Sequence, residues 1–337
     1  MEAGANLLVT CGGRWVGMVL QLKQAMSSVP ALRNGRILIA DRAPLTPAGC
    51  FADGSLVVPS VEHPEYVDNL LDVCRRQGVR VVLPIIDIDL RRLAPHAGRF
   101  ADAGATLVCP PSEVVELCLD KTRFAAFARE YHLLHPCTYM PDKLTDDLFP
   151  LFMKRRMGFG SIGAGLCRSL GDAKRALQQD PDLIFQEYVN NTEISVDAFV
   201  SRTGRCTVRV PRVRDKVIGG EAVQTHTIRS ERIADLADRT LVALAARGLR
   251  GPANVQLFAG DSPMLIEVNP RLGSASVLSN VASDGRLFVS VLGESCGETH
   301  DGDPDSYREL SLHRFLGDVF HDGLLPVGLV PSNGGPR

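Results

Sequence analysis

Short apolar runs alternate with amphipathic stretches along the first third of the chain, and no other feature constrains the fold as strongly. The runs have the length of β-strands and occupy residues 6–11, 36–40, 79–83 and 105–108. Between them, residues 15–26 and 64–77 carry apolar side chains at helical spacing, and the second stretch stops at Gly78, a residue typical of helix C-termini. This strand–helix–strand series predicts a parallel sheet with helices on both faces.

The pattern changes after Asp120. Strand signals now follow one another with few helices between them, at residues 150–154, 184–188, 193–200, 206–213, 222–227, 256–258 and 264–268. Helical patterns occur at residues 122–132 and 231–247. The second has one apolar stripe, formed by Ile233, Leu236, Ala237, Leu241 and Leu244. We therefore expect antiparallel sheet here, so that an α/β part is followed by an α+β part.

Composition excludes several classes of partner. The net charge is -2 and the basic residues are scattered, which argues against binding to nucleic acid or to an anionic membrane. The nine cysteines include no C-x-x-C pair, so neither a disulfide framework nor a zinc site is indicated, and reduced thiols are expected. The start of the chain has no basic segment leading into an apolar run, and no apolar stretch reaches membrane-spanning length. We expect a cytoplasmic protein with small-molecule partners.

Four glycines follow the strand that ends at Lys154, namely Gly158, Gly160, Gly163 and Gly165. Arg155 and Arg156 lie between that lysine and the glycines, so a backbone rich in free N–H donors lies beside three cations. Glycine lets the backbone approach phosphate oxygens closely, which suits a polyphosphate ligand. A plain β-hairpin turn is the alternative interpretation, and the adjacent cations favour phosphate. The stretch is not a Walker A loop, because no Lys-Ser/Thr pair follows the last glycine.

A second group of polar residues lies within the apolar strand at residues 264–268. Glu267 and Asn269 are two residues apart, so on a strand they project to the same face, and Gln256 on the paired strand can reach the same point. Oxygen ligands of this kind suit magnesium bound to nucleotide phosphates. A single glutamate on a strand is usually solvated. Its apolar neighbours here would make an unpaired carboxylate costly to bury, and this favours a metal site.

Two further features are open to more than one interpretation. The strand that ends in Gln-Glu-Tyr-Val, residues 186–189, and the strand that begins at Glu193 can offer backbone groups to an adenine edge and a carboxylate to ribose. Four cations are concentrated on one strand and its loop, namely Arg209, Arg212, Arg214 and Lys216. They form either an exposed cationic strand face or a group that stabilises a reacting phosphoryl anion.

Taken in order, these segments resemble the ATP-grasp superfamily, and within it the carbamoyl-phosphate-synthetase-like carboxylate–amine ligases. The resemblance covers nearly the whole chain. It comprises the strand–helix–strand opening, Asp120–Thr122, Lys154–Gly165, residues 186–189, Glu193–Asp197, Gln256 and Glu267-Val-Asn-Pro-Arg271, the most specific element. One departure concerns the segment before the glycines, where such ligases usually carry Lys-Pro-Arg and this chain has Arg155 in the middle position.

The resemblance implies a fold of three parts and a role for each motif. The parts are a Rossmann-like N-terminal domain at residues 1–110, a central region with a glycine-rich ATP lid at 111–188, and a C-terminal antiparallel-sheet domain with the magnesium site at 189–330. The implied ATP-binding residues are Lys121, Lys154, Arg156, Gly160, Ser161, Gly163, Glu187, Tyr188, Val189 and Glu193. The implied metal ligands are Gln256, Glu267 and Asn269. The implied catalytic residues are Arg214, Lys216 and Arg271.

The activity implied by the resemblance is ATP-dependent ligation. A small carboxylate would be activated as an acyl phosphate and attacked by an amine, with release of ADP and phosphate. ATP and Mg²⁺, with Mn²⁺ as a substitute ion, are the implied cofactors, and a homodimer is expected because members of the superfamily are commonly dimers. Two alternatives remain at this stage: phosphorylation of bicarbonate for carbamoyl or carboxyl transfer, and a non-catalytic module that binds ATP. Asp87, Asp89 and residues 273–280 are candidates for lining the acceptor pocket, although Asp87 and Asp89 could equally act on a helix dipole.

Overall fold

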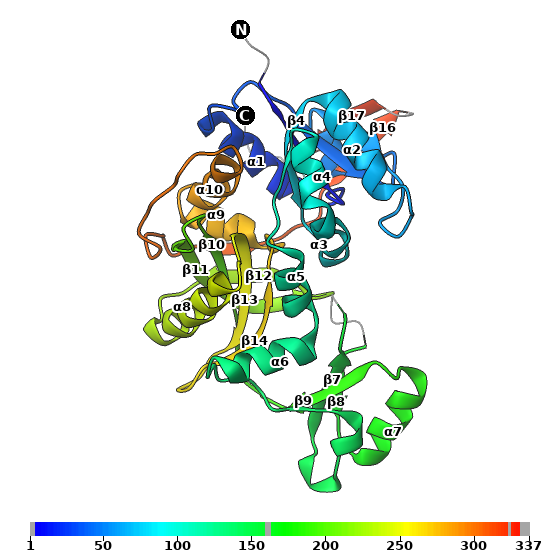
Figure 1. The fold of residues 1–337 in the computed structure, drawn as a ribbon, viewed down its shortest axis with the longest axis vertical. Coiled ribbons are helices and arrows are strands. Elements are labelled where there is room, and N and C mark those ends of the chain that lie inside the picture. Colours follow the sequence, from blue (N-terminus) through cyan, green and yellow to red (C-terminus); the bar gives the residue numbers. More distant parts are fainter. Residues whose placement is uncertain (1–3, 159–162, 323–324, 331–337) are drawn as a thin grey trace. The chain divides into compact units, whose positions relative to one another are not determined.

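The computed structural model describes residues 4–158, 163–322 and 325–330, and the chain forms two compact units (Figure 1). The first comprises Met1–Cys109, Gly285–His300 and Leu312–Arg337, and the second comprises Pro110–Asp284 and Asp301–Ser311. The predicted three-part division of the chain stays a prediction. Within the described residues, no helix is both long enough and apolar enough to span a membrane.

The first unit contains the predicted parallel sheet. Its strand order is β3-β2-β1-β4-β5, and every pairing is parallel. The strands are β1 (Asn6–Thr10), β2 (Ile37–Asp41), β3 (Gly54–Val57), β4 (Val79–Pro84) and β5 (Thr106–Leu107). Leu7, Leu8 and Val9 of β1 are fully buried, as a central strand covered on both faces requires. The sequence patterns missed β3, whose side chains alternate between partly buried and exposed positions at the edge of the sheet.

Helices α1 (Val16–Ser28) and α2 (Tyr66–Gln77) begin and end near the predicted positions. The unit also contains helices that the apolar spacing did not predict, namely α3 (Asp87–Leu93), α4 (Ala97–Asp102) and α10 (Arg286–Ser295), with 3₁₀ turns η1 (Ala48–Cys50) and η2 (Ala94–His96). Gly78 ends α2 in the left-handed conformation, at a φ of 59°, and its N–H donates to the carbonyl of Cys74. Helix α10 comes from far along the chain and packs on α1.

The larger sheet of the second unit is antiparallel, as predicted, with the order β14-β13-β10-β11-β12. Its strands are β10 (Glu193–Val200), β11 (Cys206–Ile218), β12 (Glu221–Thr227), β13 (Gly251–Phe258) and β14 (Met264–Asn269). Three helices cover its apolar face, namely α5 (Ser112–Leu119), α6 (Lys121–Glu130) and α8 (Glu231–Ala246). Helix α9 (Ser276–Ala282) packs against β11 and β12.

A smaller antiparallel sheet in the same unit has the order β6-β9-β7-β8. Its strands are β6 (Thr138–Tyr139), β7 (Leu151–Arg155), β8 (Gly165–Cys167) and β9 (Leu183–Glu187), with helix α7 (Leu170–Gln179) and 3₁₀ turns η3 (Pro141–Lys143) and η4 (Asp146–Leu148). It has a hydrophobic cluster of its own, built from Leu151, Cys167, Ala173, Leu183 and Phe185. The glycine-rich stretch connects β7 to β8, and Gly160 and Ser161 lie outside the described residues.

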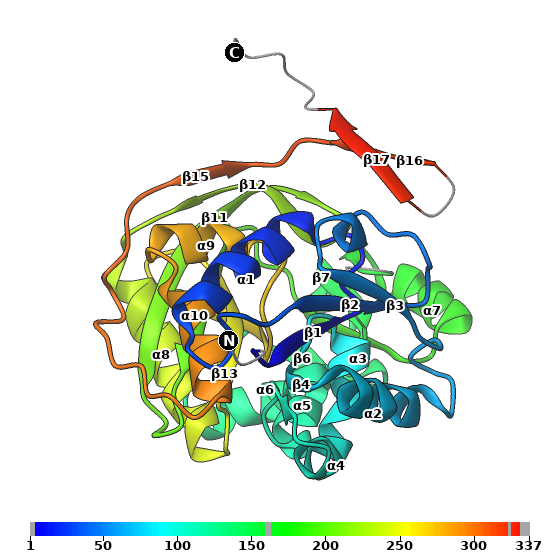
Figure 2. The same ribbon diagram turned by 90° about the horizontal axis from the view of Figure 1, so that it is seen from above.

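The C-terminal part of the chain adds strands that the sequence patterns did not predict. After β15 (Ser311–His313), strands β16 (Asp318–Asp322) and β17 (Leu325–Val330) form an antiparallel pair that belongs to the first unit (Figure 2).

Candidate nucleotide and metal site

Polar side chains form two neighbouring rows on one face of the large sheet. The strand register fixes the rows, because residues directly opposite each other on adjacent strands point to the same face. The first row runs from β14 to β12 through Glu267, Gln256, Ser195, Arg212 and Thr227. The second runs through Asn269, Asn254 and Asp197. The face opposite the α8 layer is therefore lined with polar groups over three adjoining strands.

The local sequence explains why these groups share one face. Along β10, Ile194, Val196 and Ala198 belong to the apolar cluster, and the residues between them point the other way. On the β13–β14 pair the register shifts between Gln256 and Leu257. This bulge lets Leu257 and Leu265 enter the core while Gln256 and Glu267 stay on the polar face.

The three predicted metal ligands are arranged consistently with a common site. Gln256 lies directly opposite Glu267, and Asn269 follows two residues further along β14 on the same face. All three are partly buried. The set has one carboxylate and two amides. Within the described part of the chain, no group of three or more His, Cys, Asp or Glu residues could hold a metal ion. Oxygen donors of this kind fit Mg²⁺ that keeps nucleotide phosphates as its other ligands.

Lys154 lies on β7 of the smaller sheet. Its side chain is buried, and burial lowers the pKa of its ammonium group to about 8. The negative charges of Glu267 and Glu193 raise that pKa, and the positive charge of Lys121 lowers it further. Lys121, at the start of α6, donates from Nζ to the carbonyl of Gly158 at 2.9 Å. Both predicted phosphate-binding lysines therefore lie at the β7 end of the glycine-rich stretch.

The predicted cations differ in how far they are already paired. Arg214 forms an ion pair with Glu193, 3.1 Å from its Nε to Oε2, and Nη2 donates to the carbonyl of Gly220 at 3.0 Å. The pKa of Arg214 is lowered, chiefly by burial. Arg156 pairs with Asp120 at 3.3 Å, and Arg271 donates to its neighbour's carbonyl at 3.1 Å. Lys216 is exposed on β11. Glu193 and Arg214, predicted to contact different parts of the substrates, are thus joined to each other.

The cationic strand is not an exposed face. Arg209 and Arg212 are buried, and they point to opposite faces of the sheet. Arg209 pairs with Asp238 and Asp305, while Arg212 lies in the polar row and pairs with Asp197. The interpretation as an exposed cationic strand face is therefore wrong for these two arginines.

The predicted adenine-binding segment follows the end of β9. Glu187 exchanges contacts with Cys137: its N–H donates to the carbonyl of Cys137 at 2.9 Å, and its Oε2 accepts from the N–H of Cys137 at 3.3 Å. Tyr188 is 40% exposed and Val189 partly buried. At the far end of the glycine-rich stretch, Gly163 has a φ of 73°, a conformation that favours glycine.

The sequence patterns assigned no role to Asp197, although its carboxylate accepts three side-chain hydrogen bonds on the polar face. Its Oδ2 accepts from Arg212 Nε at 2.8 Å and from Ser279 Oγ at 2.6 Å, and its Oδ1 accepts from Asn254 Nδ2 at 2.6 Å. A signal was present in the sequence, since Ser195 and Asp197 alternate with apolar residues just as Asn254 and Gln256 do.

Asp89 does not line an open pocket in the first unit. It is fully buried, and its oxygens accept from Thr10 Oγ1 at 2.5 Å and from the hydroxyl of Tyr66 at 2.7 Å. Burial raises the pKa of its carboxyl group to about 6, although these hydrogen bonds lower it in part. Its oxygens are therefore engaged within the unit rather than aimed at a ligand.

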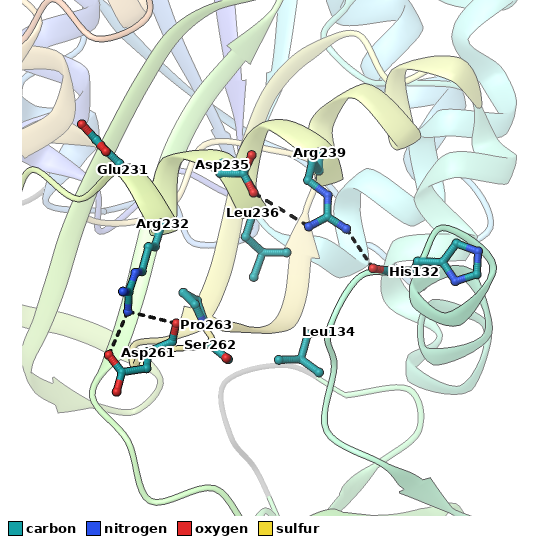
Figure 3. Close-up of a pocket in the computed structure, with 10 residues that line it drawn as sticks. All are labelled: His132, Leu134, Glu231, Arg232, Asp235, Leu236, Arg239, Asp261, Ser262 and Pro263. Atoms are coloured by element: carbon teal, nitrogen blue, oxygen red, sulfur yellow. Dashed lines mark hydrogen bonds and ion pairs between the residues drawn. The ribbon is translucent and has the colours of Figure 1, made fainter.

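A surface groove of about 540 Å³ lies elsewhere in the second unit, between α8 and the turn that joins β13 to β14 (Figure 3). Its charged side chains are largely paired: Arg232 with Asp261 at 2.8 Å, and Arg239 with Asp235 at 3.8 Å. None of the predicted site residues lines it. Because α8 packs on the apolar face of the sheet, this groove is separate from the polar rows.

A parallel α/β unit together with a unit of two antiparallel sheets defines the class of protein, the ATP-grasp fold. Family models agree with the structure. A model described as PylC-like, N-terminal domain matches residues 7–108, and a model of the ATP-grasp domain matches residues 118–275. The chain belongs to the ATP-grasp superfamily. No curated protein sequence matches it significantly.

Solved structures share the fold at low sequence identity. The biotin carboxylase domain of 2-oxoglutarate carboxylase from Hydrogenobacter thermophilus, solved as a dimer with MgADP, ADP and bicarbonate, is 14% identical with a TM-score of 0.72, covering 91% of this chain and 73% of that one. L-amino acid ligase from Bacillus licheniformis is 14% identical with a TM-score of 0.71, covering 96% of this chain and 83% of that one. N5-carboxyaminoimidazole synthetase from Staphylococcus aureus is 14% identical with a TM-score of 0.69, covering 89% of this chain and 79% of that one.

Proposed function

We propose that this protein is an ADP-forming ligase that activates a small carboxylate as an acyl phosphate and joins it to an amine. The observation that carries the proposal is a row of oxygen ligands whose charge acts on a buried lysine: Gln256 lies directly opposite Glu267, and the charge of Glu267 raises the pKa of Lys154. A cation beside a carboxylate–amide set suits the phosphates of ATP with their metal ion.

The reaction has two balanced steps. An oxygen of the substrate carboxylate attacks the γ-phosphorus of ATP, and the bond from that phosphorus to the bridging oxygen breaks, releasing ADP. The amine nitrogen then attacks the acyl carbon, loses a proton, and expels phosphate, which keeps one oxygen from the carboxylate. Phosphoryl transfer needs little covalent help from the protein, so positioning and charge neutralisation account for most of the catalysis.

The residues divide this work between them. Lys154 and Lys121 would hold the phosphates, with Arg156 and the stretch around Gly163 covering them. Glu187 and the backbone of Tyr188 and Val189 would bind adenine, and Glu193 the ribose. Mg²⁺, or Mn²⁺ in its place, would neutralise phosphate charge at Gln256, Glu267 and Asn269. Arg214 and Arg271, with Lys216 in a supporting position, would face the anion that develops on the acyl phosphate.

An isotope experiment tests the acyl phosphate directly. Carboxylate–amine pairs would first be screened for ADP formation that requires both substrates. The active carboxylate would then be supplied with ¹⁸O in its carboxyl group, and the released phosphate would be analysed by mass spectrometry. We expect one ¹⁸O atom per phosphate. Unlabelled phosphate from a productive pair would exclude an acyl phosphate.

Glu267→Ala is expected to lower substrate-dependent ADP formation by roughly two orders of magnitude or more, comparable with the loss of one preorganised electrostatic group. The matched control is Asp261→Ala in the turn of the same hairpin, where the side chain is fully exposed. That variant should stay within about twofold of the unaltered protein, as a surface change usually does. Near-normal activity of Glu267→Ala would remove this residue from the metal site.

Phosphorylation of bicarbonate is the second candidate, because the fold is shared with a biotin carboxylase domain solved with bicarbonate. The two candidates differ in what triggers ADP formation. A carboxylate–amine ligase forms ADP only with its own substrate pair, whereas a bicarbonate enzyme forms ADP with bicarbonate alone. An assay in bicarbonate-depleted buffer separates them.

A further inference from the structure

A continuous chain of hydrogen bonds links Asp197 to the predicted metal ligand Gln256. Asp197 lies on β10 directly opposite Asn254 on β13, and Asn254 Nδ2 donates to Asp197 Oδ1 at 2.6 Å. Asn254 and Gln256 are two residues apart on the same face, and Gln256 Nε2 donates to Asn254 Oδ1 at 3.3 Å. Carboxylate, first amide and second amide thus form one line across two strands.

We infer that Asp197 is a positioning residue that fixes, through Asn254, which end of the Gln256 amide faces the metal ion. The inference rests on the proposed function, since it assumes that Gln256 binds the cation of the nucleotide.

We call the hydrogen-bonded line from Asp197 through Asn254 to Gln256 the relay. Its direction follows from the chemistry of Asp197. A carboxylate only accepts hydrogen bonds, so Asn254 must turn its NH₂ group toward Asp197 and its oxygen toward Gln256. Gln256 must then donate its own NH₂ group to that oxygen. The only end of the Gln256 amide that remains is its carbonyl oxygen, Oε1, which is the end that a hard cation requires.

Glutamine needs this help, whereas a glutamate would not. Both ends of a carboxylate are oxygen, so either rotation about the terminal bond gives a metal ligand. In an amide, rotation by half a turn replaces the oxygen with a donor that repels a cation. Partners beyond the metal ligands commonly fix such orientations, and their loss typically costs metal affinity by roughly 10- to 100-fold.

The surroundings hold Asp197 in place. Arg212 Nε and Ser279 Oγ both donate to Oδ2, leaving Oδ1 for Asn254. Asp197 and Arg212 are each 2% exposed, and Asn254 is 3% exposed, so water competes little for these bonds. Gly273 packs closely over the relay: a Cβ added there would lie 3.2 Å from Asn254 Nδ2 and 3.3 Å from Asp197 Oδ1.

A double-mutant cycle on the full chain tests the inference through metal binding rather than turnover. Mn²⁺ would be titrated in the presence of a non-hydrolysable ATP analogue, and bound ion would be measured by electron paramagnetic resonance. Asn254→Ala should weaken Mn²⁺ binding by about tenfold or more, because Gln256 then loses its orienting partner. In a Gln256→Glu background the same change should alter binding by less than about twofold, because a carboxylate needs no orientation.

The controls separate orientation from damage to the fold. Asp261→Ala, in the fully exposed turn of the same β13–β14 hairpin, removes only a surface ion pair with Arg232 and should leave Mn²⁺ binding within about twofold. If Asn254→Ala does not fold, Asn254→Val keeps a residue that suits a strand and offers no hydrogen bond.

Each outcome decides the inference. Equal losses in both backgrounds would show that Asn254 acts only on structure, and no loss with Gln256 present would show that the amide is not oriented by the relay. A failure of the proposed function gives a different result: Glu267→Ala would then leave Mn²⁺ binding intact, placing the metal site elsewhere. A loss of binding in Glu267→Ala with no loss in Asn254→Ala overturns the relay alone.

Discussion

Lys154 is the residue at which burial and function meet most directly. Its ammonium group is buried on β7, and burial lowers its pKa from 10.5 to about 8. Between these two values the unfolded chain binds more protons than the folded protein, so the stability of the fold rises with pH across this window and is lower below pH 8. A charged group kept at such a cost is expected to have a ligand of opposite charge.

Nucleotide binding should therefore be coupled to proton uptake. The phosphates favour the charged form of Lys154, so binding raises its pKa and the complex takes up a proton at pH values where the free lysine was neutral. At pH 8, where about half of the free lysine is protonated, we expect uptake approaching about half a proton per nucleotide, and almost none at pH 6. Calorimetry in buffers of different ionisation enthalpy measures this number.

Lys154→Arg provides the control for this measurement, because a guanidinium group stays charged throughout the range. That variant should bind nucleotide without the proton uptake seen at pH 8. Unchanged uptake in Lys154→Arg would assign the proton to another group.

At the scale of elements, the large sheet of the second unit has two faces with opposite tasks. One face packs against α5, α6 and α8, and the other carries the polar rows. Helix α8 packs on the first face with its apolar stripe, and all the predicted stripe residues are buried: Ile233, Leu236, Ala237, Leu241 and Leu244. The strand register sets which polar side chains on neighbouring strands lie beside one another.

Leu241→Ala is expected to destabilise the second unit by about 2–5 kcal/mol, because Leu241 is 1% exposed and its truncation leaves a cavity. Val242→Ala, the next residue on the same helix, is the control: it is 67% exposed and should change stability by less than about 0.5 kcal/mol. Urea denaturation measures both values. Similar effects for the two variants would contradict the packing of α8 described above.

At the scale of the whole molecule, chain order and spatial order differ. The first unit begins at the N-terminus, yet it includes α10, which follows the last residue of the second unit's main segment. Leu287, Phe288, Val291 and Leu292 of α10 are buried, and the helix packs on α1. Each unit also has its own hydrophobic cluster. Stability should therefore respond separately in the two units.

Phe288→Ala is expected to lower the stability of the first unit by about 3–5 kcal/mol, since Phe288 is fully buried. Hydrogen exchange should then report faster opening at residues 6–109 and unchanged protection at residues 193–258. The matched control is Phe315→Ala, the same truncation at a position 79% exposed in the same unit. Equal loss of protection in both units would mean that they unfold as one.

Part of the geometry of the candidate site could be predicted from the sequence, because short motifs contain its residues. Glu267 and Asn269 share a face through the two-residue period of a strand, and Lys154 precedes the glycine-rich stretch directly. The relay was not legible. Asp197 and Asn254 are 57 residues apart and Asp197 and Ser279 are 82 apart, and nothing local to these residues indicates that they touch.

The sequence by itself determined the periodic elements: the parallel strands of the first unit, the antiparallel run that follows, and the apolar stripe of α8. These depend on backbone geometry and on the spacing of apolar residues, which act over a few positions. Only the tertiary structure decided the contact of Asp197 with Asn254, the burial of Lys154 and the return of α10 to the first unit. These depend on strand register and on the packing of distant segments, which no short stretch of sequence encodes.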